Sequence, residues 1–197
     1  GDSGSGESEI RKWIIENDLL ECIVSLPDNL FFNTGITTYL WIVTNKKKNN
    51  RKGKIQLIDG QSKFVIMKKK LGEKRKKVSE INRKDILDLY RNFQENEFSK
   101  IYENEFFGYT RVTIEQPLIE NGKEVTTKNG KLKPNTKLRD SERIPLSENI
   151  EEYYNREVKT HLPDSWMDRE KDKVGYEINF TKYFYQYKPL RNLKEIT

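Results

Sequence analysis

The sequence has almost none of the residues that build disulfides or metal sites. Its 197 residues include one cysteine, Cys22, and one histidine, His161. One cysteine excludes an internal disulfide framework, and a single His with a single Cys cannot form a Cys/His metal cluster. We therefore predict no metal site. Cys22 lies in an apolar run and is interpreted as a core residue, and His161 as a structural or surface residue.

Long apolar runs are also missing. No stretch of 18 apolar residues is present, and the N-terminus lacks the basic-then-apolar layout of a secretory signal, so no membrane span or leader is predicted. Hydrophobic residues make up 34% of the chain and charged residues 35%, yet aromatics reach 11%, which is too rich for a disordered protein. We expect a folded, soluble, cytoplasmic protein with large solvated loops.

The sequence also lacks a recognisable reaction centre. The glycine-rich start, residues 1–8, matches neither G-x-x-x-x-G-K-[ST] nor G-x-G-x-x-G, and no strand precedes it. No Ser/His/Asp set can be identified, and the spacing of the many carboxylates certifies no pair. We therefore predict no catalytic, cofactor-binding or metal-binding residue in this chain.

Positive charge is concentrated in one segment. Residues 46–84 carry 16 Lys/Arg and 3 Asp/Glu, whereas the rest of the chain holds 21 basic and 28 acidic residues, so the net charge of +6 belongs to this segment. Phosphate contacts supply most of the sequence-independent affinity for nucleic acid, which makes a polyanion partner attractive. A solvated Lys-rich surface is the alternative. The candidate phosphate contacts are Lys68, Lys69, Lys70, Lys74, Arg75, Lys76 and Lys77.

The first half of the chain predicts a helix and three strands. Apolar spacing indicates a helix over about 7–17, with Ser5 as a possible cap. Short apolar runs predict buried strands at 20–26 and 37–44, separated by a loop, and a third strand follows at 54–59. The segment 64–84 is basic and broken by Gly72. A helix is predicted over 84–94, with an entry signal at Ser79 and Asn82.

The second half predicts a strand, an excursion and a helix. A strand at 106–116 ends at Pro117, and the pairs Asn121-Gly122 and Asn129-Gly130 predict tight turns in an exposed β-hairpin excursion. A helix is expected over 145–160, with Ser147 as N-cap. The aromatic segment 175–187 either folds onto the chain's own core or forms an interface.

The order helix, strand, loop, strand, strand resembles the closing half of an α/β sheet, in which the last strands often run antiparallel. The earlier βαβ units of a doubly wound sheet are not present. We therefore expect an incomplete domain: either the chain begins within a domain, or its strands complete the sheet of another chain.

The loop between the first two predicted strands is the most informative local feature. It reads PDNLFFNTG over residues 27–35, and neighbouring residues in an extended chain point in opposite directions, so Phe31 and Phe32 cannot easily share one core. One ring should reach a cleft. An enzyme that acts on a base in duplex DNA must extrude it, and an aromatic ring then recovers part of the lost stacking. Taken on the residues alone, core packing of Phe31 and Phe32 is the favoured interpretation, and base stacking is the alternative.

A family resemblance adds to this interpretation. The stretch GSGESEIRKWIIENDLLECIVSLPDNLFFNTGITTYLWIVTNKK is similar to the later part of the catalytic domain in modification subunits of type I restriction-modification systems, which are adenine-N6 DNA methyltransferases. The likeness continues through RKGKIQLIDGQ, LGEKRKKVSEI, FFGYTRVTIEQPL, LRDSERIPL, REVKTHLPDSW and KVGYEINFTKYFY. It is weakest across residues 119–137. The chain is accordingly interpreted as a C-terminal part of such a subunit from a bacterium or archaeon.

The resemblance implies an architecture. The fold class is α/β: the C-terminal portion of a Rossmann-like, S-adenosylmethionine-dependent methyltransferase sheet, then a β-hairpin excursion and a helical, aromatic-rich extension. The expected segments are 1–117 for the catalytic domain, 118–140 for the excursion and 141–197 for the extension. The extension would contact the specificity subunit. We hypothesise that truncation after Arg139 leaves the strand region folded and abolishes that contact.

The resemblance also implies a site and partners. The target-base loop would consist of Phe31, Phe32, Asn33, Thr34 and Gly35, and the sequence does not settle which phenylalanine stacks on the flipped adenine. Expected partners are double-stranded DNA, the specificity and restriction subunits, and a second modification subunit, with no membrane.

The chain departs from the family in two motifs. The glycine-containing S-adenosylmethionine loop and the Asn-Pro-Pro-Tyr/Phe motif that binds the adenine amine are absent. We therefore predict that the fragment alone neither binds the cofactor well nor methylates DNA. The alternative function is a non-catalytic nucleic-acid-binding interaction module that completes a partner's sheet and clamps nucleic acid through residues 46–84.

Overall fold

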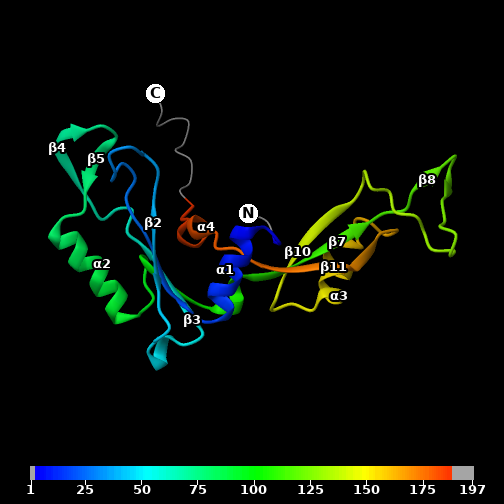
Figure 1. Ribbon diagram of the computed structural model, residues 1–197, viewed down its shortest axis with the longest axis horizontal. Coiled ribbons are helices and arrows are strands. Elements are labelled where there is room, and N and C mark those ends of the chain that lie inside the picture. The colour runs from blue at the N-terminus through cyan, green and yellow to red at the C-terminus, as the bar shows by residue number, and fades with distance from the viewer. Residues whose placement is uncertain (1–2, 188–197) are drawn as a thin grey trace, which may run out of the picture. The chain divides into compact units, whose positions relative to one another are not determined.

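The computed structural model describes residues 3–187 and divides into two compact units (Figure 1). Unit 1 contains the chain up to residue 19 together with residues 103–178, and unit 2 contains residues 20–102 and the chain from residue 179. This division differs from the three consecutive segments 1–117, 118–140 and 141–197 expected from the sequence. The reason is that a strand of the first segment pairs with strands of the third, as described below.

Unit 2 is built on a mixed four-stranded sheet of order β2-β1-β3-β6. Its strands are β2 (Tyr39–Val43), β1 (Leu20–Ser25), β3 (Lys54–Asp59) and β6 (Ser99–Glu103). β1 runs parallel to β3 and antiparallel to β2, so the expectation of an α/β sheet with an antiparallel strand is confirmed. The sequence analysis did not predict β6.

Helix α2 (Glu80–Asn92) covers one face of this sheet (Figure 1). It begins four residues before the predicted start because Ser79 and Asn82 form a reciprocal capping box. On the sheet side, Ile86, Leu89 and Tyr90 pack against a buried cluster of β1 and β3. That cluster consists of Cys22, Val24 and Ile58. Cys22 is therefore a core residue, as predicted.

Strand β2 is not buried, which corrects the prediction for residues 37–44. All six residues of β1 are buried, whereas β2 stands at the edge of the sheet and four of its five residues are exposed. Leu40 is 53% exposed and Val43 49%. An apolar run predicted burial correctly for β1, which is a central strand. The similar run of β2 is less covered because β2 lies at the edge of the sheet.

A two-stranded hairpin follows β3 in the basic segment. It consists of β4 (Val65–Leu71) and β5 (Lys74–Lys77), and Gly72 turns the chain with a φ of +58°. The sequence analysis recognised the break at Gly72 but predicted no strands here. Lysine runs have a low β propensity, so the pattern gave no strand signal.

Unit 1 is built on a three-stranded antiparallel sheet of order β10-β7-β11. The central strand β7 (Gly108–Glu115) follows a short turn of helix at Asn104–Phe107, and its neighbours are β10 (Asp140–Pro145) and β11 (Trp166–Tyr176). Seven of the eight residues of β7 are buried. Truncation after Arg139 would remove both strands that pair with β7, whereas the four strands of the unit 2 sheet would remain, so we expect survival of the unit 2 sheet alone.

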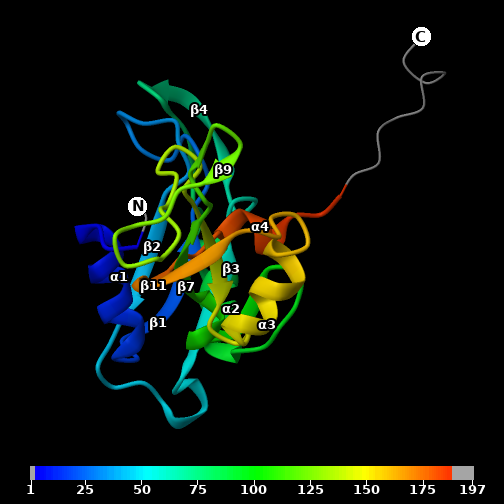
Figure 2. The same cartoon turned by 90° about the vertical axis from the view of Figure 1, so that its right-hand side faces the viewer.

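Helical turns pack on this sheet (Figure 2). Helix α3 (Ile150–Tyr153) continues into a π-helical turn, Tyr154–Val158. The predicted helix over 145–160 begins late because Pro145 belongs to β10, and the N-cap is Asn149 instead of Ser147, accepting from the amides of Glu151 and Glu152. The buried cluster of this unit contains Val112, Ile114, Ile144, Tyr154 and Val158.

Helix α1 (Gly6–Glu16) also belongs to unit 1 and matches the predicted helix at 7–17. Ser5 caps it, accepting from the amide of Ser8 at 3.4 Å, as predicted. The guanidinium of Arg11 donates to the carbonyl of Tyr176 in β11 at 2.8 Å. Helix α1 is thus bound to the last strand of this unit.

Two further segments complete the described chain. Residues 118–139, here called the tongue, form a narrow ribbon that includes the hairpin β8 (Ile119–Glu120) and β9 (Lys123–Glu124). Helix α4 (Phe180–Phe184) belongs to unit 2, where Phe180 packs on Tyr39 with ring centroids 5.2 Å apart and Tyr183 packs on Tyr102 at 5.1 Å. Within residues 3–187, no helix is long and apolar enough to cross a membrane.

Candidate nucleic-acid interface

The loop between β1 and β2 exposes both phenylalanines. Phe31 is 45% exposed and Phe32 66%, so neither ring lies in the core, and core packing of both rings is excluded. A β-bridge between Phe31 and Thr34 makes the turn tight, and Asn29 adopts a left-handed φ of +52°. The loop therefore presents two adjacent aromatic rings to solvent on a constrained backbone.

The hairpin β4–β5 holds this loop in place. The amide of Glu73 donates to the carbonyl of Phe32 at 2.9 Å, and the amide of Arg75 donates to the carbonyl of Asn29 at 2.9 Å. The side-chain amide of Asn29 donates in turn to the carbonyl of Glu73 at 3.1 Å. The predicted base loop and the predicted phosphate-binding run, about forty residues apart in sequence, thus form one connected site.

Gly72 sets how closely the hairpin approaches the loop. A Cβ atom at Gly72 would lie 2.7 Å from the carbonyl oxygen of Phe32 and 3.2 Å from a carbon of its ring. Both distances are shorter than ordinary van der Waals contacts, and the left-handed φ also favours glycine. The ring of Phe32 therefore rests against the hairpin turn.

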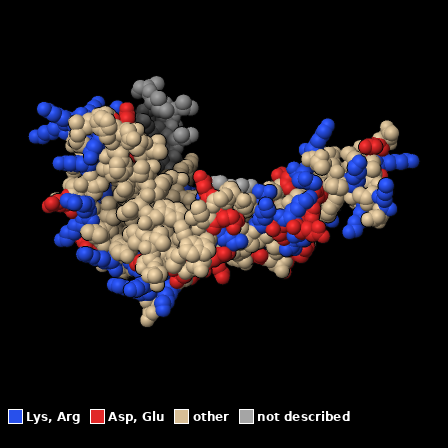
Figure 3. Space-filling view, in the orientation of Figure 1, with Lys and Arg blue, Asp and Glu red and all other residues tan. Residues whose placement is uncertain are grey.

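The basic side chains of the hairpin surround this contact. Figure 3 shows Lys and Arg projecting at this end of unit 2. Of the seven predicted phosphate contacts, Lys68, Lys69, Lys70, Arg75 and Lys77 are exposed and Lys74 is half-buried. Lys76 is engaged within the site, because its ammonium pairs with Asp28 and lies 4.0 Å from the centroid of the Phe64 ring. Lys76 is thus a weaker candidate for a phosphate contact than its neighbours.

Asn33, Thr34 and Gly35 have different positions within the loop. The hydroxyl of Thr34 accepts from the amide of Ile36 at 3.4 Å, and the carbonyl of Gly35 accepts from the amide of Asn29 at 3.4 Å. Asn33 is exposed beside the two rings. Thr34 and Gly35 therefore shape the loop, whereas the side chain of Asn33 is accessible to a ligand.

Part of the basic segment 46–84 is structural. Arg51 is buried in unit 2, where its guanidinium contacts Glu21 at 3.3 Å and donates to Gln56 at 3.0 Å. It lies between the rings of Tyr90 and Phe93, 4.4 and 4.2 Å from their centroids. Burial and the hydrogen bond to Glu21 raise the pKa of Tyr90 to about 12. This cation stabilises the fold and does not belong to the interface.

The candidate site does not fit S-adenosylmethionine. The reacting centre of that cofactor is a sulfonium cation, which the lysines of the hairpin would repel. Of the carboxylates beside the loop, Asp28 is paired with Lys76, and that of Glu73 lies next to Gly35. No group of His, Cys, Asp and Glu that could hold a metal ion occurs among residues 3–187. The site suits an anionic polymer that carries flat bases.

The match to a known family accords with this geometry. The model of the N-6 DNA Methylase family matches residues 2–130, well over half of the chain. The chain belongs to this family. The resemblance to adenine-N6 methyltransferases predicted from the sequence is therefore confirmed.

Individual relatives are subunits of type I restriction enzymes. The chain is 33% identical over 125 residues to the type I restriction enzyme MjaIX methylase subunit of Methanocaldococcus jannaschii, covering 63% of this chain and 21% of that protein. It is 47% identical over 57 residues to the HindI methylase subunit of Haemophilus influenzae, covering 29% and 12%.

A solved structure is also similar: the methyltransferase subunit of a type I restriction-modification system from Streptococcus thermophilus. It is 27% identical with a TM-score of 0.45, and the match covers 53% of this chain and 21% of that one. The chain thus spans about a fifth of the length of the first curated relative and of this structure.

Proposed function

We propose that this chain forms the target-base loop and a DNA-facing surface of a type I restriction-modification methyltransferase subunit. The whole protein would transfer a methyl group from S-adenosylmethionine to N6 of adenine in double-stranded DNA. The observation that supports this is the pair of exposed rings of Phe31 and Phe32. The backbone of their loop is hydrogen-bonded to a hairpin rich in exposed lysines.

Physical chemistry links these two features to one ligand. Extruding a base from a duplex costs a few kcal/mol, and stacking on an aromatic ring returns about 1–3 kcal/mol. Exposed lysines beside the rings neutralise phosphates of the same strand. Because backbone hydrogen bonds connect the hairpin to the loop, binding of the phosphates and placing of the base would be coupled.

Other parts of the proposed function lie outside this site. S-adenosylmethionine would be bound mainly by residues outside the chain, and we propose that the chain alone does not methylate DNA. Residues 141–197 would contact the specificity subunit, and the assembled complex would include a restriction subunit and a second modification subunit. Incorporation of labelled methyl groups into adenine by the chain alone would contradict the proposed inactivity.

The base-binding role is tested with a duplex that contains one 2-aminopurine opposite an abasic site. The unpaired base is already unstacked, so the chain should bind this duplex more tightly than the fully paired one. Phe31→Ala or Phe32→Ala should weaken the preference by about 1–3 kcal/mol, or roughly 5- to 150-fold in Kd. Binding is measured by anisotropy, and stacking by 2-aminopurine fluorescence.

Ile36→Ala serves as the matched control, because Ile36 is an apolar residue of the same loop region and is 70% exposed. It should leave the preference for the unpaired base unchanged. The variant that loses the preference identifies the stacking ring. If both phenylalanine variants behave like Ile36→Ala, neither ring binds the base and the assignment of the loop is wrong.

The alternative function is a non-catalytic nucleic-acid-binding module, and the exposed lysines favour it equally. The two functions predict different affinities for the duplex that contains the unpaired base. A module that only clamps nucleic acid through residues 46–84 would bind paired and unpaired duplexes with the same affinity, and both affinities would fall together with salt.

A further inference from the structure

The tongue, residues 118–139, is a second basic surface, in unit 1. It carries six basic and two acidic residues, and most of its side chains are exposed. Lys123, Lys128, Lys131, Lys133 and Lys137 are all exposed, and none of them has an ion pair among residues 3–187. Figure 3 shows their end of unit 1 with Lys and Arg projecting outward. The sequence analysis placed the positive charge at 46–84 and did not identify this surface.

Main-chain hydrogen bonds give the tongue a defined shape without a core of its own. The amide of Val125 donates to the carbonyl of Leu118 at 2.9 Å. The amide of Leu118 donates to the carbonyl of Lys133, and the amide of Lys133 to the carbonyl of Val125, at 2.8 Å each. Turns at Gly122 and Gly130 have φ values of +75° and +76°, and nothing lies within 4 Å of a Cβ built at either position. The tongue is thus a narrow ribbon with open tips.

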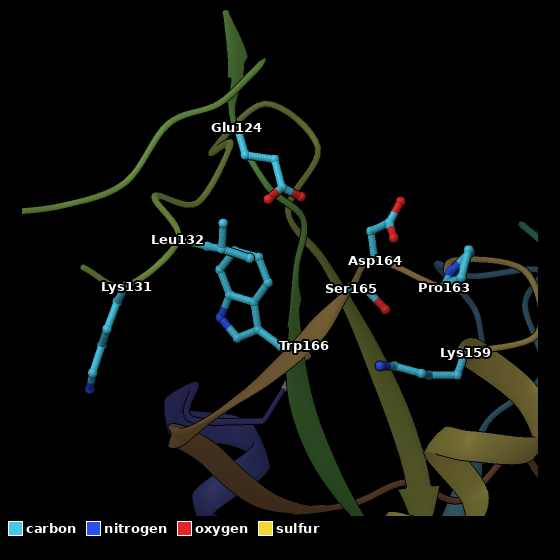
Figure 4. Close-up of a pocket in the computed structure, with 8 residues that line it drawn as sticks. All are labelled: Glu124, Lys131, Leu132, Lys159, Pro163, Asp164, Ser165 and Trp166. Atoms are coloured by element: carbon cyan, nitrogen blue, oxygen red, sulfur yellow. The ribbon is translucent and has the colours of Figure 1, made fainter. Parts of the chain in front are cut away.

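The apolar side of the tongue attaches to the rest of unit 1. Leu132 and Trp166 line a cavity of about 520 Å³, which Glu124, Lys159 and Asp164 also border. Figure 4 shows Leu132 lying over the indole of Trp166, whereas Lys131 points away from it. Lys133 lies on the same side of the extended strand as Lys131, because residues two apart share a face. Lys131 also borders this cavity, but its ammonium extends away from Trp166, and Lys131 and Lys133 are both exposed.

An ion-pair network fixes the root of the tongue. Glu115 is 1% exposed, and its carboxylate accepts from the guanidinium of Arg139 at 2.8 Å and from the ammonium of Lys171 at 3.1 Å. Arg139 is thus used by the fold. The five lysines further along the tongue have no comparable role, and their positive charge is available to a partner.

We propose that the tongue is a second nucleic-acid contact, which binds the phosphates of duplex DNA through Lys123, Lys128, Lys131 and Lys133. The choice of DNA rests on the proposed function. Two further observations support it. A two-stranded ribbon has the width to enter the major groove, and lysine is depleted in protein–protein interfaces, which favour aromatic anchors that the tongue lacks. An acidic protein surface is the competing partner.

The experiment compares three variants that each remove four positive charges. The first changes Lys123, Lys128, Lys131 and Lys133 of the tongue to Gln. The second changes Lys68, Lys69, Lys70 and Lys77 of the hairpin to Gln. The control changes Lys12, Arg91, Lys173 and Lys182, which lie outside both the basic segment 46–84 and the tongue, to Gln. Binding of each to a short duplex is measured over a range of NaCl concentrations, and circular dichroism checks the fold.

The slope of log affinity against log salt should fall by about 0.9 for each lysine that contacts a phosphate. We expect the tongue variant to lose more slope than the control. A tongue variant with the slope of the control overturns the inference. If the hairpin variant alone loses slope, the proposed function stands and only the tongue assignment fails. If the unaltered chain does not bind DNA, the proposed function fails as well.

Discussion

Phe32 owes its position to a residue that has no side chain. Its carbonyl accepts from Glu73, and its ring lies against Gly72, so the hairpin turn supports both the backbone and the side chain of the proposed base-binding residue. Phe31 has no such support from Gly72. Gly72 therefore supports the position of Phe32, whose ring is nevertheless the more exposed of the two, at 66% against 45% for Phe31.

Gly72→Ala tests this contact. The left-handed φ alone should cost about 1–2 kcal/mol, and the clash with the Phe32 carbonyl should add to it. Gly130→Ala is the matched control, since Gly130 has a φ of +76° but open space around it. Urea unfolding should show a larger loss for Gly72→Ala than for Gly130→Ala. Equal losses would mean that the hairpin does not press on the loop.

A second prediction concerns Cys22. Burial raises the pKa of its thiol from 9.0 to about 12. Below pH 9 the thiol is protonated in both folded and unfolded chains, but above pH 9 only the unfolded chain ionises. The stability should therefore fall as pH rises from 9 toward 12, by at most about 1.4 kcal/mol per pH unit from this group. Cys22→Ala should flatten the decline of unfolding free energy measured by urea titration, and an unchanged decline would contradict the assignment.

At this scale the sequence identified the rings but not their support. Phe31 and Phe32 were found from their adjacency in a loop and from the family resemblance, and the hairpin lysines from charge alone. Contacts such as Phe32 with Gly72 join residues about forty positions apart and depend on the path of the chain. No local pattern encodes them, so only the fold could reveal that the two features form one site.

Among the elements, the sequence predicted those with strong local signals. The α1 and α2 helices have caps and helical spacing, and β1 and β3 are short apolar runs. The strands it missed, β4, β5, β6, β10 and β11, carry charged side chains that an amphipathic pattern does not distinguish from a loop. Long-range pairing overrides weak propensity in these strands.

The exposed edge strand β2 leads to a prediction at this scale. Edge strands with apolar side chains pair readily with other chains, and a lysine on the edge suppresses such pairing. Leu40→Lys should reduce self-association of the 197-residue chain, measured by light scattering at increasing concentration. Ile81→Lys is the control, because Ile81 is 74% exposed on helix α2 and not on an edge. An equal gain from both variants would indicate a general effect of charge.

At the scale of the molecule, the aromatic segment 175–187, here called the tail, bears on both the fold and a partner. Phe180 and Tyr183 pack on residues of unit 2, which favours the interpretation that the aromatic segment folds onto the chain itself. Tyr185 and Tyr187, in contrast, are each 73% exposed. Residues 188–197 lie outside the described part of the chain. Within the described part of the tail, the two exposed tyrosines are the candidates for an interface role.

Changing Tyr185 and Tyr187 to Ser tests the proposed interface with a specificity subunit without changing any residue of β7. We expect co-purification with that subunit to fall several-fold while the thermal transition stays unchanged, because exposed aromatic anchors dominate binding energy when buried by a partner. Ile10→Ser with Ile81→Ser, at positions 63% and 74% exposed, controls for lost apolar surface. Undiminished co-purification would remove the tail from the interface.

The bond from Arg11 to the carbonyl of Tyr176 spans 165 residues. During synthesis α1 therefore leaves the ribosome well before its partner strand β11. Strand β7 likewise waits for both of its neighbours. Unit 1 therefore has a high contact order and cannot be completed until β11 has emerged, so its assembly should be slow.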